Sequence, residues 1–276
     1  MADTLPAALD FLAPSVVPNL LRVGNWKDGG YIVPYPVIAS AQALISCGIN
    51  REWSFEEDFR AINPRAAIHG YDHTVSERIL RRQFRRGLLG FAIGRVSRAE
   101  AARRFWLWKE FRAFFGSKAR HFEEKIVAED AHRAGEATLD RAFSRIGTAH
   151  GDIILKIDIE GDEYGIIDAI LSHAKRISAL LIEFHYTTLR REEFCRAVLG
   201  LQHEFELVHL HGNNCSPIYP DGLPGALELT FVRRTGESLP KRMELPIDLD
   251  RPNDPGRPDC SLRFSSLQNS RLAAVT

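Results

Sequence analysis

The 276-residue sequence has few cysteines, no long apolar run and no net charge, and each absence excludes a class of protein. Its four cysteines, at positions 47, 195, 215 and 260, form neither a C-x-x-C pair nor a zinc-ligand spacing. This pattern argues against a disulfide scaffold and for reduced thiols in a cytoplasm. No segment approaches the roughly 18 consecutive apolar residues of a membrane-spanning helix. Residues 1–14 lack the basic and apolar regions of a signal peptide, so we expect a cytoplasmic protein. Because 36 basic residues balance 36 acidic ones, the whole chain is not a general polyanion binder.

The sequence does contain enough apolar material for a sizeable core. Apolar residues make up 45% of the chain and charged residues 26%, which is ordinary for a globular protein. We therefore expect a single domain over residues 1–276. Its expected parts are a core over 21–233, a helical insertion over 76–120 and a C-terminal extension over 235–276.

Strand-like and helix-like segments alternate from Ala43 to Phe205, which predicts a doubly wound α/β domain with a mostly parallel, Rossmann-like sheet. Only a loop separates the last two strand segments, so we expect the final strand to run antiparallel. The seven expected strands cover residues 43–47, 66–71, 125–128, 152–159, 179–184, 205–210 and 227–232.

Local signals add detail to this outline. The step Asp28-Gly29-Gly30 predicts a hairpin or sharp loop within residues 21–33. The S-x-x-E pattern from Ser54 predicts a capping box and a helix start there. Further helices are expected over 138–146, after Gly161, and over 191–201. The chain from Thr235 onward is rich in proline and aspartate and is expected to wrap the surface or fray.

Ligands of such a sheet bind beyond the carboxyl ends of its strands. Gly48 ends the first of these strands and opens a capped helix, an arrangement that brings backbone N–H groups close to a ligand. Asp72 ends the next strand, where a carboxylate can accept hydrogen bonds from a ribose diol. The turn at Gly48 has one glycine and lacks the G-x-G-x-x-G of a dinucleotide site. These features favour a cationic cofactor without phosphate, such as S-adenosylmethionine.

The run LKIDIEGDE at residues 155–163 is the most specific motif in the chain. It resembles the LKIDVEGxE signature of the FkbM-type methyltransferases, a branch of the class I S-adenosylmethionine-dependent enzymes. Thr138-Leu139-Asp140, the run 44–55 and Tyr71-Asp72 are similar to further elements of that family, and the resemblance covers residues 21–233. It implies methyl transfer, typically to an oxygen of a natural product, sugar or glycan.

Seven residues are expected to contact the cofactor. Asp158 and Glu160 are two apart, so on a strand both side chains would share one face as a carboxylate pair. The loop that carries Asp28 is expected to lie over the cofactor. The expected cofactor-binding residues are Asp28, Gly30, Tyr31, Gly48, Asn50, Asp72 and Glu160. Glu163, in the first turn of a helix, is expected to be structural.

Three histidines lie on or at the ends of strands next to this site. His185 ends one strand, while His209 and His211 alternate on another and share a face. With Asp158, His185 and His211 are the expected catalytic residues. An imidazole near neutrality suits a base for a hydroxyl group, and the same three residues could instead bind a divalent metal that acidifies that hydroxyl. The sequence leaves these two roles open.

Charge is balanced globally but not locally. Residues 76–120 hold thirteen lysines and arginines against three acids, a net charge of +10. Arginines recur there at helical spacing, above a run of aromatic residues. The segment predicts a solvated basic face, a lid that grips an anionic acceptor, or a patch on an anionic membrane surface; nucleic acid ranks last because no recognised module accompanies it. The expected acceptor-binding residues are Arg81, Arg85, Asn213 and Asn214.

The sequence therefore predicts an S-adenosylmethionine-dependent O-methyltransferase for a hydroxyl of a sugar, glycan or related small acceptor, and the +10 segment adds an anionic acceptor as an option. Two alternatives stay open. The single glycine at residue 48 also fits a non-catalytic binding or assembly protein that keeps the fold, and the carboxylate and histidine cluster fits a metal-dependent hydrolase.

Overall fold

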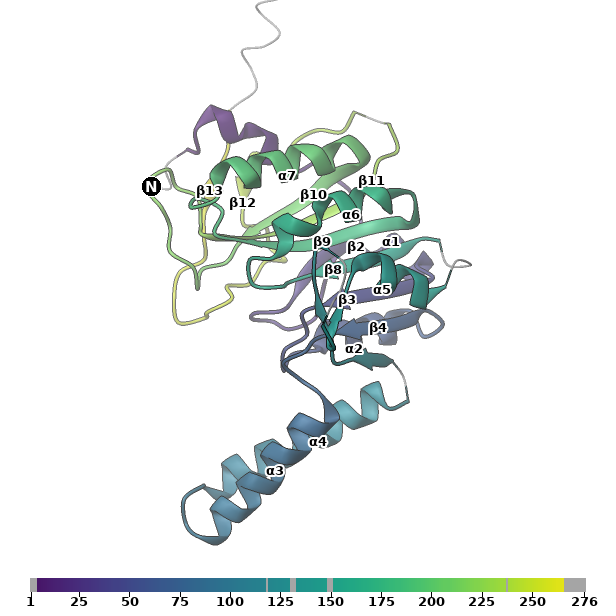
Figure 1. Ribbon diagram of the computed structural model, residues 1–276. Helices are drawn as coiled ribbons and strands as arrows, with labels where there is room; N and C mark the ends of the chain where they lie inside the picture. Colours follow the sequence, from purple (N-terminus) through teal and green to yellow (C-terminus); the bar gives the residue numbers. More distant parts are fainter. Residues whose placement is uncertain (1–3, 118, 130–132, 148–150, 237, 266–276) are drawn as a thin grey trace, which may run out of the picture.

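A seven-stranded sheet forms the centre of the molecule, with the strand order β10-β11-β9-β8-β3-β4-β5 (Figure 1). The computed structural model describes residues 4–117, 119–129, 133–147, 151–236 and 238–265. The strands of the central sheet are β3 (Ala43–Cys47), β4 (Ala67–Tyr71), β5 (Arg120–Phe122), β8 (Ile153–Ile157), β9 (Ile177–His185), β10 (Phe205–Gly212) and β11 (Ala226–Arg233).

The directions of the strands confirm the predicted fold class. β3 runs parallel to β4 and β8, β4 runs parallel to β5, and β8 runs parallel to β9. β11 is antiparallel to both of its neighbours, β9 and β10. The chain order reverses between β3 and β8, because β3 connects outward to β4 on one side and β8 to β9 on the other. This is the switch point at which open α/β sheets bind their ligands.

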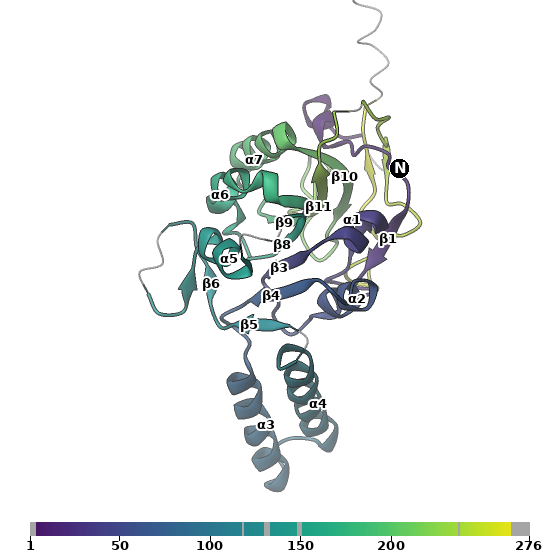
Figure 2. The ribbon, with the colours of Figure 1, turned by 90° about the vertical axis from the view of Figure 1, so that its right-hand side faces the viewer.

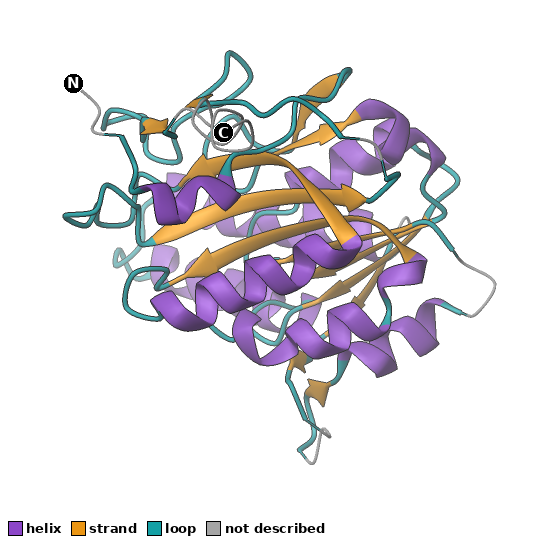
Figure 3. Cartoon of the chain, turned by 90° about the horizontal axis from the view of Figure 1, so that it is seen from above, coloured by secondary structure: helices purple, strands orange, loops and turns teal. Residues whose placement is uncertain are grey.

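Helices cover both faces of the sheet (Figures 2 and 3). Figure 2 shows α5, α6 and α7 on one side and α1 and α2 on the other. Successive strand residues point to opposite faces, so Ile45 joins the core under α5 to α7 and Leu44 joins the core on the other side. The helices are α1 (Tyr35–Ser40), α2 (Ser54–Ile62), α3 (Glu77–Ala92), α4 (Arg98–Phe115), α5 (Leu139–Ile146), α6 (Ile167–Ser172) and α7 (Arg191–Glu204), with the 3-10 helices η1 (Ala7–Leu12), η2 (Glu163–Ile166) and η3 (Ala174–Arg176).

Three two-stranded pairs complete the fold. β1 (Leu20–Val23) and β2 (Tyr31–Pro34) form the hairpin predicted around Asp28-Gly29-Gly30. The other two pairs are β6 (Lys125–Ile126) with β7 (Glu136–Ala137), and β12 (Glu244–Leu245) with β13 (Leu262–Arg263).

The prediction of the third sheet strand was wrong. The strand beside β4 is β5, at residues 120–122, whereas the predicted residues 125–128 supply β6 of a separate pair. β5 is a short edge strand with an exposed arginine and half-buried neighbours, so it lacks the apolar run by which buried strands are found.

The helix α2 begins at Ser54 as predicted, but for a different reason. The Ser54 side chain makes no cap hydrogen bond, and Trp53 holds the N-cap position. Instead, the Ser54 backbone N–H donates to a carboxylate oxygen of Glu52 at 2.9 Å. An acid two residues upstream therefore replaces the expected capping box.

The basic segment folds as two helices, α3 and α4, which pack together as a hairpin. Ser76 and Ser97 cap them, each hydroxyl accepting from the backbone N–H three residues on. Phe84 stacks on Trp108 between the helices, with ring centroids 5.6 Å apart. The hairpin projects from the edge of the sheet away from the body of the molecule (Figures 1 and 2).

The C-terminal extension is more than a surface wrap, because its polar residues pack against β10 and β11. Asp250 contacts His209 at 3.1 Å, and Asp259 contacts His211 at 2.9 Å. Asn253 donates to Glu228 of β11 at 2.7 Å. None of the helices in the described ranges has the length and apolar content needed to cross a membrane.

Candidate active site

A cavity of about 540 Å³ opens at the switch point, at the carboxyl ends of β3, β4 and β8. Its walls come from the segments that follow these three strands, from the β1–β2 loop and from residues 124–126. This is the place that the sequence predicts for a ligand. The volume is in the range of small-molecule and cofactor sites.

Gly48 forms the tight turn that shapes the floor of the cavity. Its backbone has φ +81°, and a Cβ at this position would lie 1.6 Å from the Asp158 carbonyl oxygen. The turn is tied to both neighbouring strands, since the Gly48 N–H donates to Tyr71 O at 2.9 Å and the Asp158 N–H donates to Cys47 O at 2.9 Å. Glycine is required here because the two strand-end loops touch backbone to backbone.

Asp72 lines the cavity, but its carboxylate is already occupied. One oxygen accepts from the N–H groups of Ile49 and Asn50, and the other accepts from the N–H and hydroxyl of Thr74, at 2.5–2.8 Å. A carboxylate offers about four acceptor sites, so these bonds saturate it. Burial alone would raise the pKa of Asp72, but these hydrogen bonds outweigh burial and lower it. Asp72 thus organises the turn beside the cavity, and its role as a ribose acceptor stays a prediction.

The cavity wall is strongly acidic. Two lysines, Lys125 and Lys156, and His73 are the basic side chains among its described lining residues. Most of the acids are engaged by N–H groups or by a basic side chain, as Glu124 is by Arg145 and Asp162 by Lys125. The carboxylates that line the cavity are Asp28, Glu52, Asp72, Glu124, Asp158, Glu160 and Asp162.

His185 stands beside the cavity at the end of β9, surrounded by carboxylates. Its Nδ1 lies 3.0 Å from Glu163, a fully buried residue whose same oxygen accepts from the N–H groups of Ile159 and Gly161. Its Nε2 lies 3.7 Å from Glu160 and 4.0 Å from Asp158. Glu163 therefore fixes both the imidazole and the loop after β8.

Burial and charge shift the pKa values of this group. Burial raises the pKa of Asp158 to about 6, although Lys156 and His185 oppose the shift. Burial alone would lower the pKa of His185, but its hydrogen bond to Glu163 and the nearby carboxylates raise it to about 9. At neutral pH the histidine is thus an imidazolium. Burial, together with the charge of Asp158, also raises the pKa of the neighbouring Glu183 well above its ordinary value.

Asp158 and Glu160 do not share one face of a strand, as their spacing predicted, because both lie in the loop after β8. β8 ends at Ile157, and Glu160 adopts a left-handed turn with φ +58° and a side chain 84% exposed. Asn50 and Tyr186 also have positive φ, just beyond the ends of β3 and β9. Non-glycine residues held in this region are strained, and such strain clusters at functional sites.

His211 does not join Asp158 and His185. It lies on β10, 2% exposed, between Glu228 and Asp259 at 3.2 and 2.9 Å. Burial would lower its pKa, but these two acids raise it to about 10. Its place beside Asp158 and His185 is taken by Glu183 of β9, and the donor atoms of that trio lie within 4.8 Å of one another. The sequence missed Glu183 because a lone acid inside the strand ALLIEF gives no local signal.

Several other expected contacts lie outside the cavity. Gly30 packs against the Arg22 side chain, and Tyr31 is buried with its ring 5.7 Å from the Lys156 amine. Asn214 donates to carbonyls of the C-terminal extension, so it anchors that segment. Asn213 donates to Glu183 at 2.8 Å, which makes it a neighbour of the site.

The expected acceptor-binding arginines are also elsewhere. Arg81 and Arg85 line a separate hollow along α3, with Arg78, Arg82 and Arg86. No arginine is among the described residues that line the main cavity.

Lys156 is the functional candidate that the sequence analysis overlooked. It is 4% exposed, lines the cavity, and lies 3.7 Å from Glu56 and 3.4 Å from Gly48 O. Burial would lower its pKa, yet Glu56 and Asp158 raise it, so it stays charged. A lysine within the apolar run IILKI was the available signal, because a charge is buried in a strand only when it is paired.

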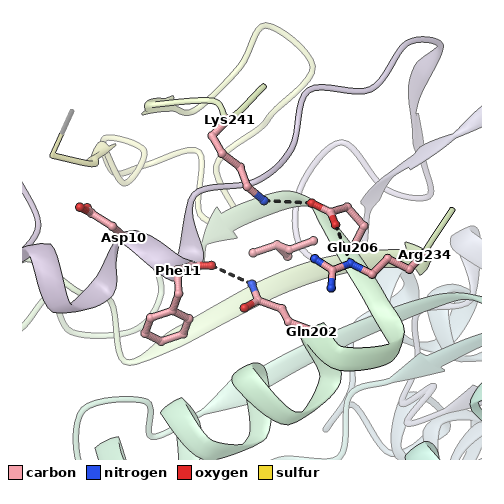
Figure 4. A pocket seen from close by; sticks show the side chains of 7 residues that line it. Asp10, Phe11, Gln202, Glu206, Arg234 and Lys241 are labelled. Atoms are coloured by element: carbon pink, nitrogen blue, oxygen red, sulfur yellow. Dashed lines mark hydrogen bonds and ion pairs between the residues drawn. The ribbon is translucent and has the colours of Figure 1, made fainter. Parts of the chain in front are cut away.

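A smaller hollow of about 290 Å³ lies between η1, α7 and β10 (Figure 4). Its polar side chains are paired: Lys241 and Arg234 contact Glu206 at 2.9 and 3.2 Å, and Gln202 donates to the backbone O of Phe11 at 2.7 Å. Asp10 accepts from Ser265. These contacts bind the extension to the body.

Comparison with known proteins finds only distant structural matches. No family model and no curated protein matches the chain. The chain is similar to the Methanococcus jannaschii fibrillarin pre-rRNA processing protein, with a TM-score of 0.38 and 9% identity over 71% of this chain and 68% of that one. It is also similar to precorrin-6y C5,15-methyltransferase from Geobacter metallireducens (TM-score 0.34, 10% identity, 72% and 88% covered) and to a 23S rRNA methyltransferase (TM-score 0.31, 12% identity, 73% and 67% covered).

The sheet order, with β11 antiparallel between β9 and β10, is consistent with a Rossmann-like methyltransferase fold. The comparisons do not confirm the FkbM-type family.

Proposed function

We propose that the chain is an S-adenosylmethionine-dependent O-methyltransferase. The observation that carries this proposal is the cavity at the switch point, with seven carboxylates and two lysines among its described lining residues. An acidic wall attracts a cation and repels a polyphosphate. The resemblance of LKIDIEGDE to the FkbM-type signature supports the same conclusion.

The residues present fit this cofactor. The Gly48 turn lets the chain approach a ligand closely, and Asp28, Asn50 and Glu160 line the same space. We infer that these four residues hold the nucleoside and the charged amino-acid portion, with Asp72 shaping the turn behind them. When bound, S-adenosylmethionine supplies a methyl group, whose bond to sulfur breaks as a bond to the acceptor oxygen forms.

The protein must then align the acceptor and remove its proton. We propose that Asp158 is the base that accepts the proton of the acceptor hydroxyl. It follows β8 at the cavity, and its carboxylate lies 4.0 Å from the His185 imidazole. Burial favours proton uptake by this carboxylate. His185, held by Glu163, stays charged and keeps Asp158 ionised until the acceptor is bound.

The acceptor that we propose is a hydroxyl group of a sugar or glycan, on the strength of the family resemblance alone. The arginines that suggested an anionic acceptor lie outside the cavity, so we do not propose that the acceptor is anionic. A screen with labelled methyl donor should include structured RNA beside sugars, because the cavity chemistry does not separate these hydroxyl donors.

Calorimetric titration with S-adenosylhomocysteine tests the cofactor assignment. We expect micromolar binding by the wild type and at least tenfold weaker binding by Asp72→Ala. That variant frees four donors, at Ile49, Asn50 and Thr74, and the turn that they hold beside the cavity loses its anchor; the buried Ile49 N–H alone would cost about 1–3 kcal/mol if left unpaired. Thr74→Val removes one of the four bonds and should have a smaller effect. A folded wild type that does not bind would favour the non-catalytic alternative.

The trio Asp158, Glu183 and His185 also fits a divalent cation by its oxygen and imidazole donors. There the cation would lower the pKa of an acceptor hydroxyl. If it binds, Mn²⁺ should raise the melting temperature of chelator-treated protein by a few degrees, and Glu183→Gln should abolish that shift. An unchanged melting temperature would leave proton removal to Asp158 alone. Metal-dependent turnover without a methyl donor would support the hydrolase alternative.

A further inference from the structure

The hairpin α3–α4 has an apolar end far from the cavity. Leu88, Leu89, Phe91 and Ile93 are 53%, 65%, 46% and 57% exposed. They account for four of the twelve large apolar side chains that are exposed in the described chain, within six consecutive residues. We call these four residues the tip. Exposed apolar clusters of this kind mark interaction sites.

Behind the tip, α3 carries a ladder of arginines. Arg81, Arg82, Arg85 and Arg86 line one hollow along the helix. Ion pairs engage other arginines of the hairpin, such as Arg103 and Arg104 with Glu100, but no described carboxylate forms an ion pair with these four. The ladder is therefore a positive surface without ion pairs among the described residues, although one acid, Glu77, lines the same hollow.

The spacing of the two features matches a lipid surface. With a rise of about 1.5 Å per residue, Arg85 and Arg86 lie about 3–9 Å behind the tip residues of the helix. An apolar face that enters a bilayer to about 5–10 Å leaves basic residues at that distance among the phosphates. Each basic residue near an anionic surface contributes about 1 kcal/mol.

We propose that the hairpin docks the protein on an anionic membrane surface, with the tip inserted among the acyl chains and the arginine ladder on the headgroups. A second copy of the chain fits the tip less well, because a symmetric contact between two tips would bring two arginine ladders together. Nucleic acid would engage the arginines but would leave the apolar tip exposed to water. This inference is independent of the proposed function.

Vesicle sedimentation of the full chain tests the proposal. We expect at least tenfold more binding to phosphatidylcholine vesicles with one part in three phosphatidylglycerol than to pure phosphatidylcholine, and less binding at high salt. Serine at all four tip positions should abolish binding, and Arg81→Glu with Arg85→Glu should reduce it at least tenfold. The matched control is Leu189→Ser with Ile218→Ser, which removes two equally exposed apolar side chains elsewhere and should bind as the wild type does.

A fluorescence measurement separates insertion from surface contact. A tryptophan introduced by Phe91→Trp should shift its emission to the blue on anionic vesicles and be quenched by brominated acyl chains. Undiminished binding by the four-serine variant would overturn the proposal. So would a concentration-dependent dimer that this variant abolishes, or RNA binding that requires the arginines while the vesicles are ignored.

Discussion

Replacing Asp158 by asparagine is expected to lower kcat by about 10²–10⁴-fold, the usual contribution of a positioned base. The affinity for S-adenosylhomocysteine should change by only a few fold, because the Gly48 turn and Asp72 remain in place. The measurement is a steady-state rate with any acceptor that the screen identifies, beside a calorimetric titration. Asp162→Asn is the control, since Asp162 lines the same cavity and is paired with Lys125 at 2.6 Å.

The pH dependence gives a second readout for Asp158. The carboxylate must be ionised to accept a proton, so the rate of chelator-treated enzyme should be low in acid and rise to a plateau. With a pKa of about 6 in the free protein, and a lower one once a cation is bound beside it, the midpoint of kcat should fall at or below about 6. A flat profile, or wild-type kcat in Asp158→Asn, would remove the assignment.

Gly48→Ala is expected to be the most damaging single substitution at the site. The new Cβ would sit 1.6 Å from the Asp158 carbonyl oxygen, in a backbone conformation with φ +81°. Left-handed backbone alone costs an alanine about 1–2 kcal/mol. The loops after β3 and β8 would also have to separate, so we expect a total loss of about 3 kcal/mol or more in unfolding free energy and no detectable binding of S-adenosylhomocysteine.

Gly94→Ala measures how much unfolding free energy is lost through the left-handed backbone alone, without a steric clash. Gly94 has φ +71° in the hairpin turn, and a Cβ there would meet no atom within 4 Å. Its substitution should therefore cost only about 1–2 kcal/mol and leave cofactor affinity unchanged. Chemical denaturation of both variants measures the difference. Equal losses would mean that the contact of Gly48 with the Asp158 loop contributes nothing to stability.

The strands of the sheet could be predicted because most are continuous apolar runs. β3 lies at residues 43–47, as predicted, and β8, β9 and β11 match within a few residues at each end. β5 escaped prediction because an edge strand is stabilised by pairing with β4 and not by an apolar sequence of its own. The S-x-x-E pattern gave the right helix start by the wrong contact, since capping depends on which oxygen reaches the N–H.

The site was predictable where it follows from strand ends and not where it depends on distant segments. Asp158 and His185 meet because they end or follow adjacent strands. His209 and His211 do share a face, as their spacing predicts, but the extension covers that face with Asp250 and Asp259. No local pattern in the sequence predicts that the C-terminal extension packs over these histidines. The sequence also could not predict that hydrogen bonds occupy all acceptor sites of the Asp72 carboxylate. That prediction requires the directions of the N–H groups in the Gly48 turn.

The position of β11 has a consequence for synthesis of the chain. Residues 226–233 are the last of the central sheet to leave a ribosome, yet they insert between two strands made earlier, β9 and β10. Until then, both earlier strands expose unpaired backbone edges, which are templates for association with other chains. A nascent chain stalled before residue 226 therefore lacks the strand that pairs with both β9 and β10. Chaperone demand should peak during that interval and fall once the final strand is seated.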